Sequence, residues 1–249
     1  MLGRKAFSVC AAFILLIAAS LGVLATSAAT APSVKDTKES SENTRVETPL
    51  NLAILVQDDL VSRVGSELNV TRDFIRSLPA GSRVMVAYVR TGALQVRQPF
   101  TDDLEKAAKA LRVPVGSTTA SPYNPYVEVI EALRRFEERG ENPNALLLIS
   151  DGLDTSRGFD IDSAANTLDL HRAIKEAKAR NVAVYSFYAP TVGLTSWNYR
   201  AIGYGQSSLN RLSNETGGRA FFQGTDFVTF DSYFDRLRGA LNEQYAKAY

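Results

Sequence analysis

Thiol chemistry is almost absent from this chain of 249 residues, which has a single cysteine, Cys10. Cys10 lies in an apolar segment near the start of the sequence, and we expect it to be removed together with that segment. The remaining chain then has no thiol, disulfide or cysteine-ligated metal. His171 is the only histidine, and no nucleophile or acid pattern surrounds it. These absences disfavour catalysis by Cys–His or Ser–His–acid arrangements.

The chain also has no excess of positive or negative charge. The chain has 28 Lys and Arg against 27 Asp and Glu, and loss of Arg4 and Lys5 with the first segment leaves it close to neutral. This balance gives no reason to expect nucleic acid or an anionic membrane surface as a partner. The sequence also has no glycine-rich phosphate-binding loop and no internal repeat.

The first 29 residues have the organisation of an export signal. Two basic residues precede the uncharged run AFSVCAAFILLIAASLGVLA, and the small residues TSAATA follow it. We therefore predict a signal peptide over residues 1–29 and a periplasmic or secreted protein. The apolar run is also about long enough to cross a bilayer, so the alternative is an uncleaved anchor in the inner membrane.

A flexible linker is predicted next, over residues 30–48, because this segment is polar, charged and contains proline. The folded domain is predicted over residues 49–249. Within it, apolar runs of strand length alternate with amphipathic helical segments. The predicted strands are LNLAILV, RVMVAYVR, LQVRQPF, NALLLIS, NVAVYSFYA and a short edge strand in TGGRAFFQ.

These strands are apolar on both faces, which is typical of a mostly parallel sheet covered by helices on each side. The turn TGA predicts a hairpin between the second and third runs, so one strand is antiparallel. We predict a three-layer α/β/α, Rossmann-like fold with six strands. Among its helices, one is expected to begin at an N-cap on Thr101.

Oxygen-bearing side chains follow the predicted strands where their carboxyl ends meet, the edge at which such sheets bind ligands. Oxygen ligands without histidine or thiol suit a hard divalent cation, Mg²⁺ or Mn²⁺. The candidate metal ligands are Asp58, Asp59, Ser62, Thr119, Ser121 and Asp151. The alternative for Asp58 or Asp59 is a structural role as the cap of the helix that starts near Val64.

Three segments resemble the von Willebrand factor type A (VWFA) domain, and more closely a bacterial VWFA-related group described from acidobacterial proteins. They are ALLLISDGLDT, LNRLSNETGGRAFF and LRGALNEQYAKAY. The resemblance covers about residues 49–248 and implies the VWFA fold. It also implies a metal-ion-dependent adhesion site (MIDAS), in which Asp151 is the aspartate after the later strand and Thr119 or Ser121 stands for the threonine.

The first motif of that site, Asp-x-Ser-x-Ser, is where this chain departs from the family. Reading from Asp58 gives Asp58, Leu60 and Ser62, whereas reading one residue earlier gives Gln57, Asp59 and Val61. Leucine cannot ligate a cation, so we predict a degenerate site. Either a second aspartate and water complete it, or the site holds no metal.

Aromatic residues are concentrated in TVGLTSWNYRAIGYGQSS, which is expected to be a long loop at the carboxyl end of a strand. It holds Trp197, Tyr199, Arg200 and Tyr204, residue types that are common in binding hot spots. Tyr123 is expected nearby. We predict a partner-binding surface here, and the alternative is that Trp197 and Ile202 pack the loop onto its own domain.

Three functions compete on this evidence. The first is a non-enzymatic module outside the cytoplasm that binds a protein, as the resemblance implies, and that meets a membrane only through an N-terminal anchor. The second is a metal-independent structural or envelope-assembly subunit. The third is a metal-dependent hydrolase, which is disfavoured because Leu60 stands where a phosphatase motif needs its second acid.

Overall fold

The computed structural model describes residues 45–121, 124–137, 142–156, 167–222 and 229–245. The predicted signal segment, most of the predicted linker and Tyr123 lie outside these ranges. None of the helices within these ranges is long and apolar enough to cross a membrane. Residues 45–48, at the end of the predicted linker, contact the last helix: Val46 is buried and the Glu47 amide donates to Asn242 Oδ1 at 3.0 Å.

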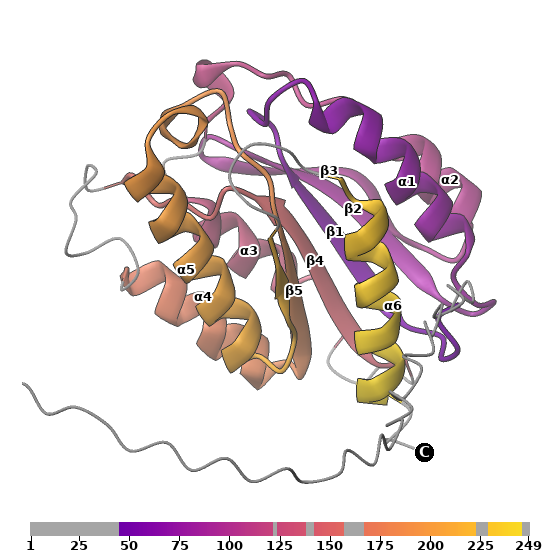
Figure 1. Ribbon diagram of the computed structural model, residues 1–249. Helices are drawn as coiled ribbons and strands as arrows, with labels where there is room; N and C mark the ends of the chain where they lie inside the picture. The colour runs from indigo at the N-terminus through magenta and orange to yellow at the C-terminus, as the bar shows by residue number, and fades with distance from the viewer. Residues whose placement is uncertain (1–44, 122–123, 138–141, 157–166, 223–228, 246–249) are drawn as a thin grey trace, which may run out of the picture. The chain divides into compact units, whose positions relative to one another are not determined.

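A six-stranded sheet forms the centre of the domain, with strand order β3-β2-β1-β4-β5-β6 (Figure 1). Only β3 is antiparallel to its neighbour, so the predicted mostly parallel sheet with one antiparallel edge strand is confirmed. The strands are β1 (Asn51–Gln57), β2 (Arg83–Arg90), β3 (Ala93–Thr101), β4 (Asn144–Ser150), β5 (Val182–Tyr188) and β6 (Ala220–Phe221).

Helices cover both faces of this sheet, which gives the predicted three layers. Helices α1 (Val64–Arg76), α2 (Leu104–Ala110) and α6 (Asp231–Tyr245) lie on one face, whereas α3 (Pro125–Leu133), α4 (Leu168–Ala179) and α5 (Tyr199–Glu215) lie on the other (Figure 1). Two short 3₁₀ helices, η1 (Thr118–Ala120) and η2 (Leu194–Ser196), follow α2 and β5.

Strand β1 shows why the sheet needs two helical layers. Leu52, Ile54 and Val56 pack into the core on the α1 side, and Ala53 and Leu55 pack into the core on the α3 side. Each is at most 1% exposed. Burial of apolar surface is the main favourable contribution to the free energy of folding. A strand that is apolar on both faces is therefore stable only where helices cover both faces.

Two predicted helix starts are wrong. Thr101 ends β3, and the cap of α2 is Asp103, whose Oδ1 accepts from the Lys106 amide at 2.9 Å. The segment predicted as a long loop over residues 191–208 turns helical at Tyr199, because Asn198 Oδ1 accepts from the first amides of α5.

The alternative role of Asp58 or Asp59 as a helix cap is also wrong. The residue at the cap position of α1 is Arg63, and its side chain makes no capping hydrogen bond. The two aspartates therefore have other contacts, which define the candidate site.

Candidate functional site

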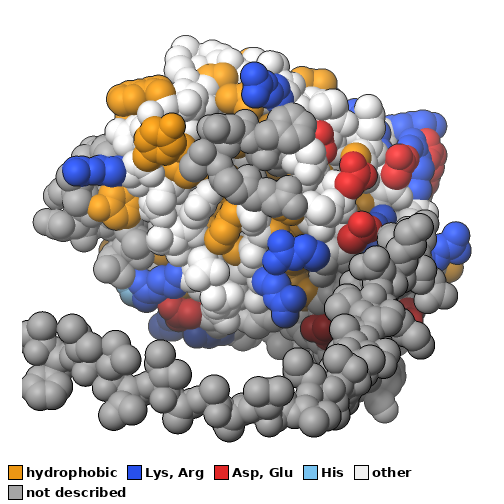
Figure 2. Space-filling model, viewed as in Figure 1, with side chains coloured by type: hydrophobic (Ala, Val, Ile, Leu, Met, Phe, Trp, Pro, Cys, Tyr) orange, Lys and Arg blue, Asp and Glu red, His pale blue; other side chains and the backbone are white. Residues whose placement is uncertain are grey.

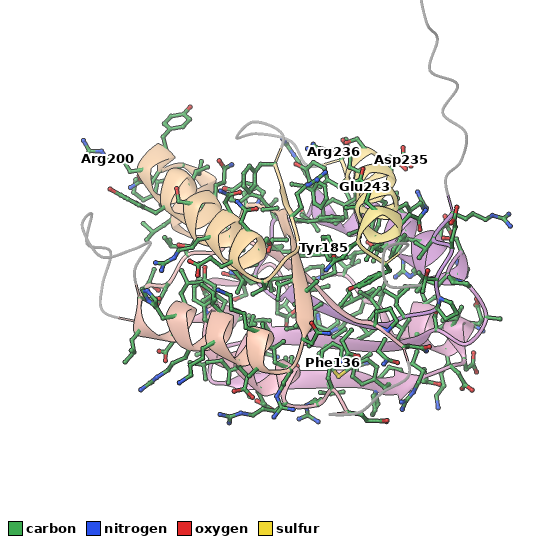
Figure 3. All side chains as sticks on the ribbon, turned by 90° about the horizontal axis from the view of Figure 1, so that it is seen from below. Phe136, Tyr185, Arg200, Asp235, Arg236 and Glu243 are labelled. Carbon is green, nitrogen blue, oxygen red and sulfur yellow. The ribbon has the colours of Figure 1, made fainter. Side chains whose placement is uncertain are left out.

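A pocket of about 210 Å³ opens at the carboxyl edge of the sheet, between the ends of β1 and β4, which are paired neighbours. It is lined by Gln57, Thr118, Ser121, Asp151, Leu153, Thr155, Thr191, Gly193 and Leu194. A larger cavity of about 350 Å³ lies between Tyr185 of β5 and Glu243 of α6 (Figure 3). It does not include the sequence-predicted site residues.

Gln57 joins the two strand ends with its side-chain amide. Its Oε1 accepts from the Ser150 hydroxyl at 2.5 Å and from the Asp151 amide at 3.2 Å. Its Nε2 donates to Asp59 Oδ1 at 2.8 Å. Gln57 and Asp59 therefore face the pocket side together, as expected for residues two apart at the end of a strand.

Asp58 points away from this pair. Its carboxylate accepts from both terminal nitrogens of Arg112, at 2.6 and 2.8 Å, and from the Val115 amide at 3.2 Å. The Arg112 guanidinium also stacks over the ring of Tyr88, 4.1 Å from its centroid. Asp58 is fully buried, so this bidentate pair supplies the counter-charge that a buried carboxylate needs.

Asp59 is also fully buried but has no charged partner of opposite sign among its contacts. Burial raises the pKa of Asp59, while the nearby Ser121 hydroxyl and the hydrogen bond from Gln57 lower it to a smaller extent. Gln57 binds Oδ1, and Oδ2 accepts no hydrogen bond that meets ordinary geometry within the described residues. Ser121 therefore lies beside Asp59 but satisfies it poorly.

Asp151 is held by three donors. Its Oδ2 accepts from the hydroxyls of Thr191 at 3.0 Å and Thr195 at 2.9 Å, and its Oδ1 accepts from the Leu153 amide at 3.1 Å. Burial, and next the charge of Asp59, raise the pKa of Asp151 to about 6. The sequence analysis missed both threonines, which reach Asp151 from the segment after β5.

The predicted ligand set is therefore divided. Ser121 and Asp151 line the pocket and Asp59 is hydrogen-bonded to the pocket residue Gln57, whereas Asp58 is turned to Arg112. Ser62 is exposed in the turn before α1. Thr119 is exposed and its hydroxyl pairs with that of Ser117 at 2.8 Å, while its neighbour Thr118 lines the pocket.

A glycine allows α5 to approach this edge. A Cβ on Gly205 would lie 1.9 Å from the carbonyl oxygen of Asp151, and one on Gly152 would lie 2.5 Å from that of Gly205. Gly152 also has a positive φ of 70°, and the Tyr126 hydroxyl donates to its carbonyl at 2.6 Å. The Asp-Gly turn is thus fixed from both α3 and α5.

The predicted partner surface begins one turn beyond the pocket wall. Trp197 is 68% exposed and Tyr199 is 74% exposed, whereas Ile202 is 4% exposed and belongs to the core. The alternative in which Trp197 and Ile202 pack onto their own domain is therefore right for Ile202 and wrong for Trp197. Arg200 extends from the first turn of α5 away from the sheet (Figure 3). Tyr204 is half-buried on the same helix.

The fold family implies a divalent cation at this edge, and the side chains do not fit one as they are arranged. Asp58 is neutralised by Arg112, and both carboxylate oxygens of Asp151 accept hydrogen bonds. Gln57 presents an uncharged amide. Within the described ranges no group of three or more His, Cys, Asp or Glu is placed to hold a metal, whereas Mg²⁺ binding sites usually include one or two free carboxylates.

Comparisons with known proteins place the fold. No protein-family model matches the sequence, and a search of curated proteins finds no match. BatB from Bacteroides thetaiotaomicron has a similar structure, with a TM-score of 0.51 and 12% identity over 80% of this chain and 99% of that chain.

Two further structures have lower scores. The SpRpn10 VWA domain has a TM-score of 0.45 and 11% identity over 78% of this chain and 95% of that chain. Proximal thread matrix protein 1 from the mussel byssus, solved with a zinc-occupied MIDAS motif, has a TM-score of 0.49 and 13% identity over 80% of this chain and 48% of that chain.

The strand order and the similarity to BatB show the three-layer, Rossmann-like α/β fold that the resemblance to the von Willebrand factor type A domain implies. This confirms the resemblance found in the sequence at the level of the fold. Membership of the acidobacterial-type group stays a prediction.

Proposed function

We propose that this chain is a protein-binding module outside the cytoplasm, which recognises its partner with the carboxyl edge of the sheet and needs no bound cation to do so. One observation carries the proposal. The exposed large hydrophobic side chains of the described residues are Val113, Val115, Val127, Leu168, Trp197 and Tyr199, and all six lie at this edge.

Topology explains how they come together. Helices α4 and α5 follow the parallel strands β4 and β5 and so begin at the carboxyl edge. Helix α3 begins there because the segment before η1 returns to the end of β1, where the Gly116 amide donates to the Asp58 carbonyl. Val127, Leu168 and Tyr199 lie in the first turns of these helices. Val113 and Val115 lie in the segment that reaches Asp58. Figure 2 shows hydrophobic side chains grouped at the upper left, over the start of α5. Apolar side chains gathered on one face are typical of an interaction surface.

The hydrogen bonds at the pocket support recognition without a cation. Arg112 donates hydrogen bonds to the carboxylate of Asp58, and two threonines donate to the carboxylate of Asp151. These donors satisfy oxygens that a bound cation would otherwise satisfy. The predicted export signal supports a location in the periplasm or outside the cell. A cation-bridged adhesion site with Mg²⁺ or Mn²⁺ is the competing form of the same function.

The test is capture of a partner by the immobilised full chain from envelope extracts of the source organism, in chelator throughout. Captured proteins are identified, purified and measured for direct binding to three forms: the unmodified chain, the Trp197→Ala/Tyr199→Ala double variant, and Lys178→Ala as a control. Lys178 is exposed near the end of α4, at the opposite edge of the sheet.

We expect the control to bind normally and the double variant to bind at least about tenfold more weakly, since buried aromatic anchors account for 2 kcal/mol or more in interfaces. Equal binding by all three forms would contradict the assignment of the surface. A specific partner that binds elsewhere would favour the structural or assembly subunit, and turnover of ester or phosphoester substrates would favour the hydrolase.

A further inference from the structure

We propose that the pocket at the carboxyl edge accepts a lysine side chain of the partner, whose ammonium group pairs with Asp59. This inference rests on the proposed function and specifies the chemistry of the partner. Among the three acids that were predicted as ligands, Asp59 is the one that has neither a counter-charge nor a hydrogen-bond donor for each oxygen.

The three acids that were predicted as ligands differ in how they are satisfied. Asp58 has the Arg112 guanidinium, and Asp151 has two hydroxyls and an amide. Asp59 is 0% exposed, and its Oδ2 has no hydrogen-bond partner in the described part of the chain. An unpaired buried carboxylate oxygen is costly, and a cationic donor would remove that cost.

Asp59 lies directly behind the pocket wall. It is bonded to Gln57 on one side and lies beside Ser121 on the other, and both of these residues line the pocket. Ser121 is only half-buried. Binding of an ammonium group at Oδ2 requires rotation of this hydroxymethyl group, after which its Oγ would accept a second hydrogen bond from the same ammonium.

The donor and acceptor count favours lysine over the other cations. One free carboxylate oxygen with hydroxyls nearby suits an ammonium, which has three donors on a single atom. A guanidinium needs a carboxylate with two free oxygens for its fork, and Asp59 Oδ1 is already bound by Gln57. A divalent cation needs more anionic oxygen than Asp59 alone supplies.

The walls of the pocket suit the rest of the side chain. Leu153 and Leu194 line it and provide apolar contact for a four-carbon stem. The Trp197 amide donates to the Leu194 carbonyl at 3.3 Å, so the exposed aromatic begins where that wall ends. The segment of the partner that carries the lysine would then lie against Trp197.

The experiment is an NMR titration of the full chain, labelled with ¹⁵N, with Nα-acetyl-lysine methylamide. Nα-acetyl-norleucine methylamide is the uncharged analogue of similar shape. The proteins are the unmodified chain, Asp59→Asn, and Asp154→Asn as a matched control. Asp154 is a buried acid on the same strand-end loop that does not line the pocket.

We expect the lysine derivative to shift amides of Gln57, Ser121 and Asp151 in a saturable way and the norleucine derivative to bind at least about tenfold more weakly. Asp154→Asn should behave like the unmodified chain, and Asp59→Asn should bind the lysine derivative no better than norleucine. Equal shifts with both derivatives, or undiminished binding by Asp59→Asn in a protein that keeps its native spectrum, would overturn the proposal.

The NMR titration and the partner-binding measurement together distinguish failure of the lysine site from failure of the proposed function. If the lysine derivative fails to bind while the Trp197→Ala/Tyr199→Ala variant still loses the partner, the surface is correct and the ammonium site is wrong. If Mg²⁺ shifts the same amides and the lysine derivative does not, the pocket is a metal site and the inference is wrong.

Discussion

The guanidinium of Arg112 meets the carboxylate of Asp58 through two hydrogen bonds of 2.6 and 2.8 Å, although 54 positions separate the two residues. This pair turns Asp58 away from the pocket and fixes the segment from α2 to η1 against the end of β1. It leaves Gln57, the last residue of β1, and Asp59 in the following turn on the side of Asp151.

Arg112→Leu should destabilise the fold by about 3 kcal/mol, because it leaves a buried carboxylate without its partner. Arg135→Leu, which removes an exposed ion pair with Glu131, should cost under about 0.5 kcal/mol. The measurement is urea unfolding. The Asp58→Leu/Arg112→Leu double variant should recover part of the loss, and additive effects of the two changes would contradict the pairing.

Stability should fall as pH rises from about 4 to about 6. The folded state holds a proton on Asp151 up to a pKa of about 6, whereas the unfolded chain loses it near the ordinary value for aspartate. The unfolded state therefore binds fewer protons in this window, which lowers stability as pH rises, by on the order of 3 kcal/mol in total.

The check is urea unfolding of the unmodified chain and of Asp151→Asn at several pH values. The difference in unfolding free energy between the two should change through this window and be constant above it. A difference that is independent of pH would show that Asp151 titrates normally in the folded chain.

Two glycines of α5 should respond oppositely to alanine. Gly205→Ala places a Cβ against the Asp151 carbonyl, so we expect a loss of about 2 kcal/mol or more and a disturbed pocket. A Cβ on Gly203 meets nothing within 4 Å, so Gly203→Ala should stabilise the helix by about 0.5–1 kcal/mol. Similar melting temperatures for the two variants would contradict the packing of α5 on the Asp-Gly turn.

Gln57→Glu should create a cation site at the carboxyl edge. The change places a third carboxylate beside Asp59 and Asp151, so the variant should be less stable in chelator by about 1–3 kcal/mol. Millimolar Mg²⁺ or Mn²⁺ should restore part of that stability by mass action. A variant that is indifferent to both ions would show that the backbone no longer supports ligation.

The fold was predictable because its signals are local. Apolar runs such as LNLAILV and NALLLIS are long enough for buried strands, and the turn TGA sets the hairpin. The start of α5 was missed because Gly203 and Gly205 weaken the helical signal. Asn198 is a strong cap type, and it is the feature that marks the start correctly.

The site was only partly predictable, because contacts distant in the sequence decide it. Asp58 and Asp59 are equally good ligand types in the sequence, but in the turn after β1 Asp58 binds Arg112 and Asp59 binds Gln57. Arg112 determines which one leaves the pocket. Thr191 and Thr195, which bind Asp151, follow a different strand, and no spacing rule links them to β4.

The most direct test of ion-free recognition is a thermal melt of the full chain in chelator and then in millimolar Mg²⁺, Mn²⁺ and Ca²⁺, beside Asp59→Ala and Asp151→Ala. The carboxylates of Asp58 and Asp151 are hydrogen-bonded without a cation, so we predict no change in Tm with any ion. An increase in Tm with Mg²⁺ or Mn²⁺ that both variants lose would contradict the account and establish a metal-dependent adhesion site.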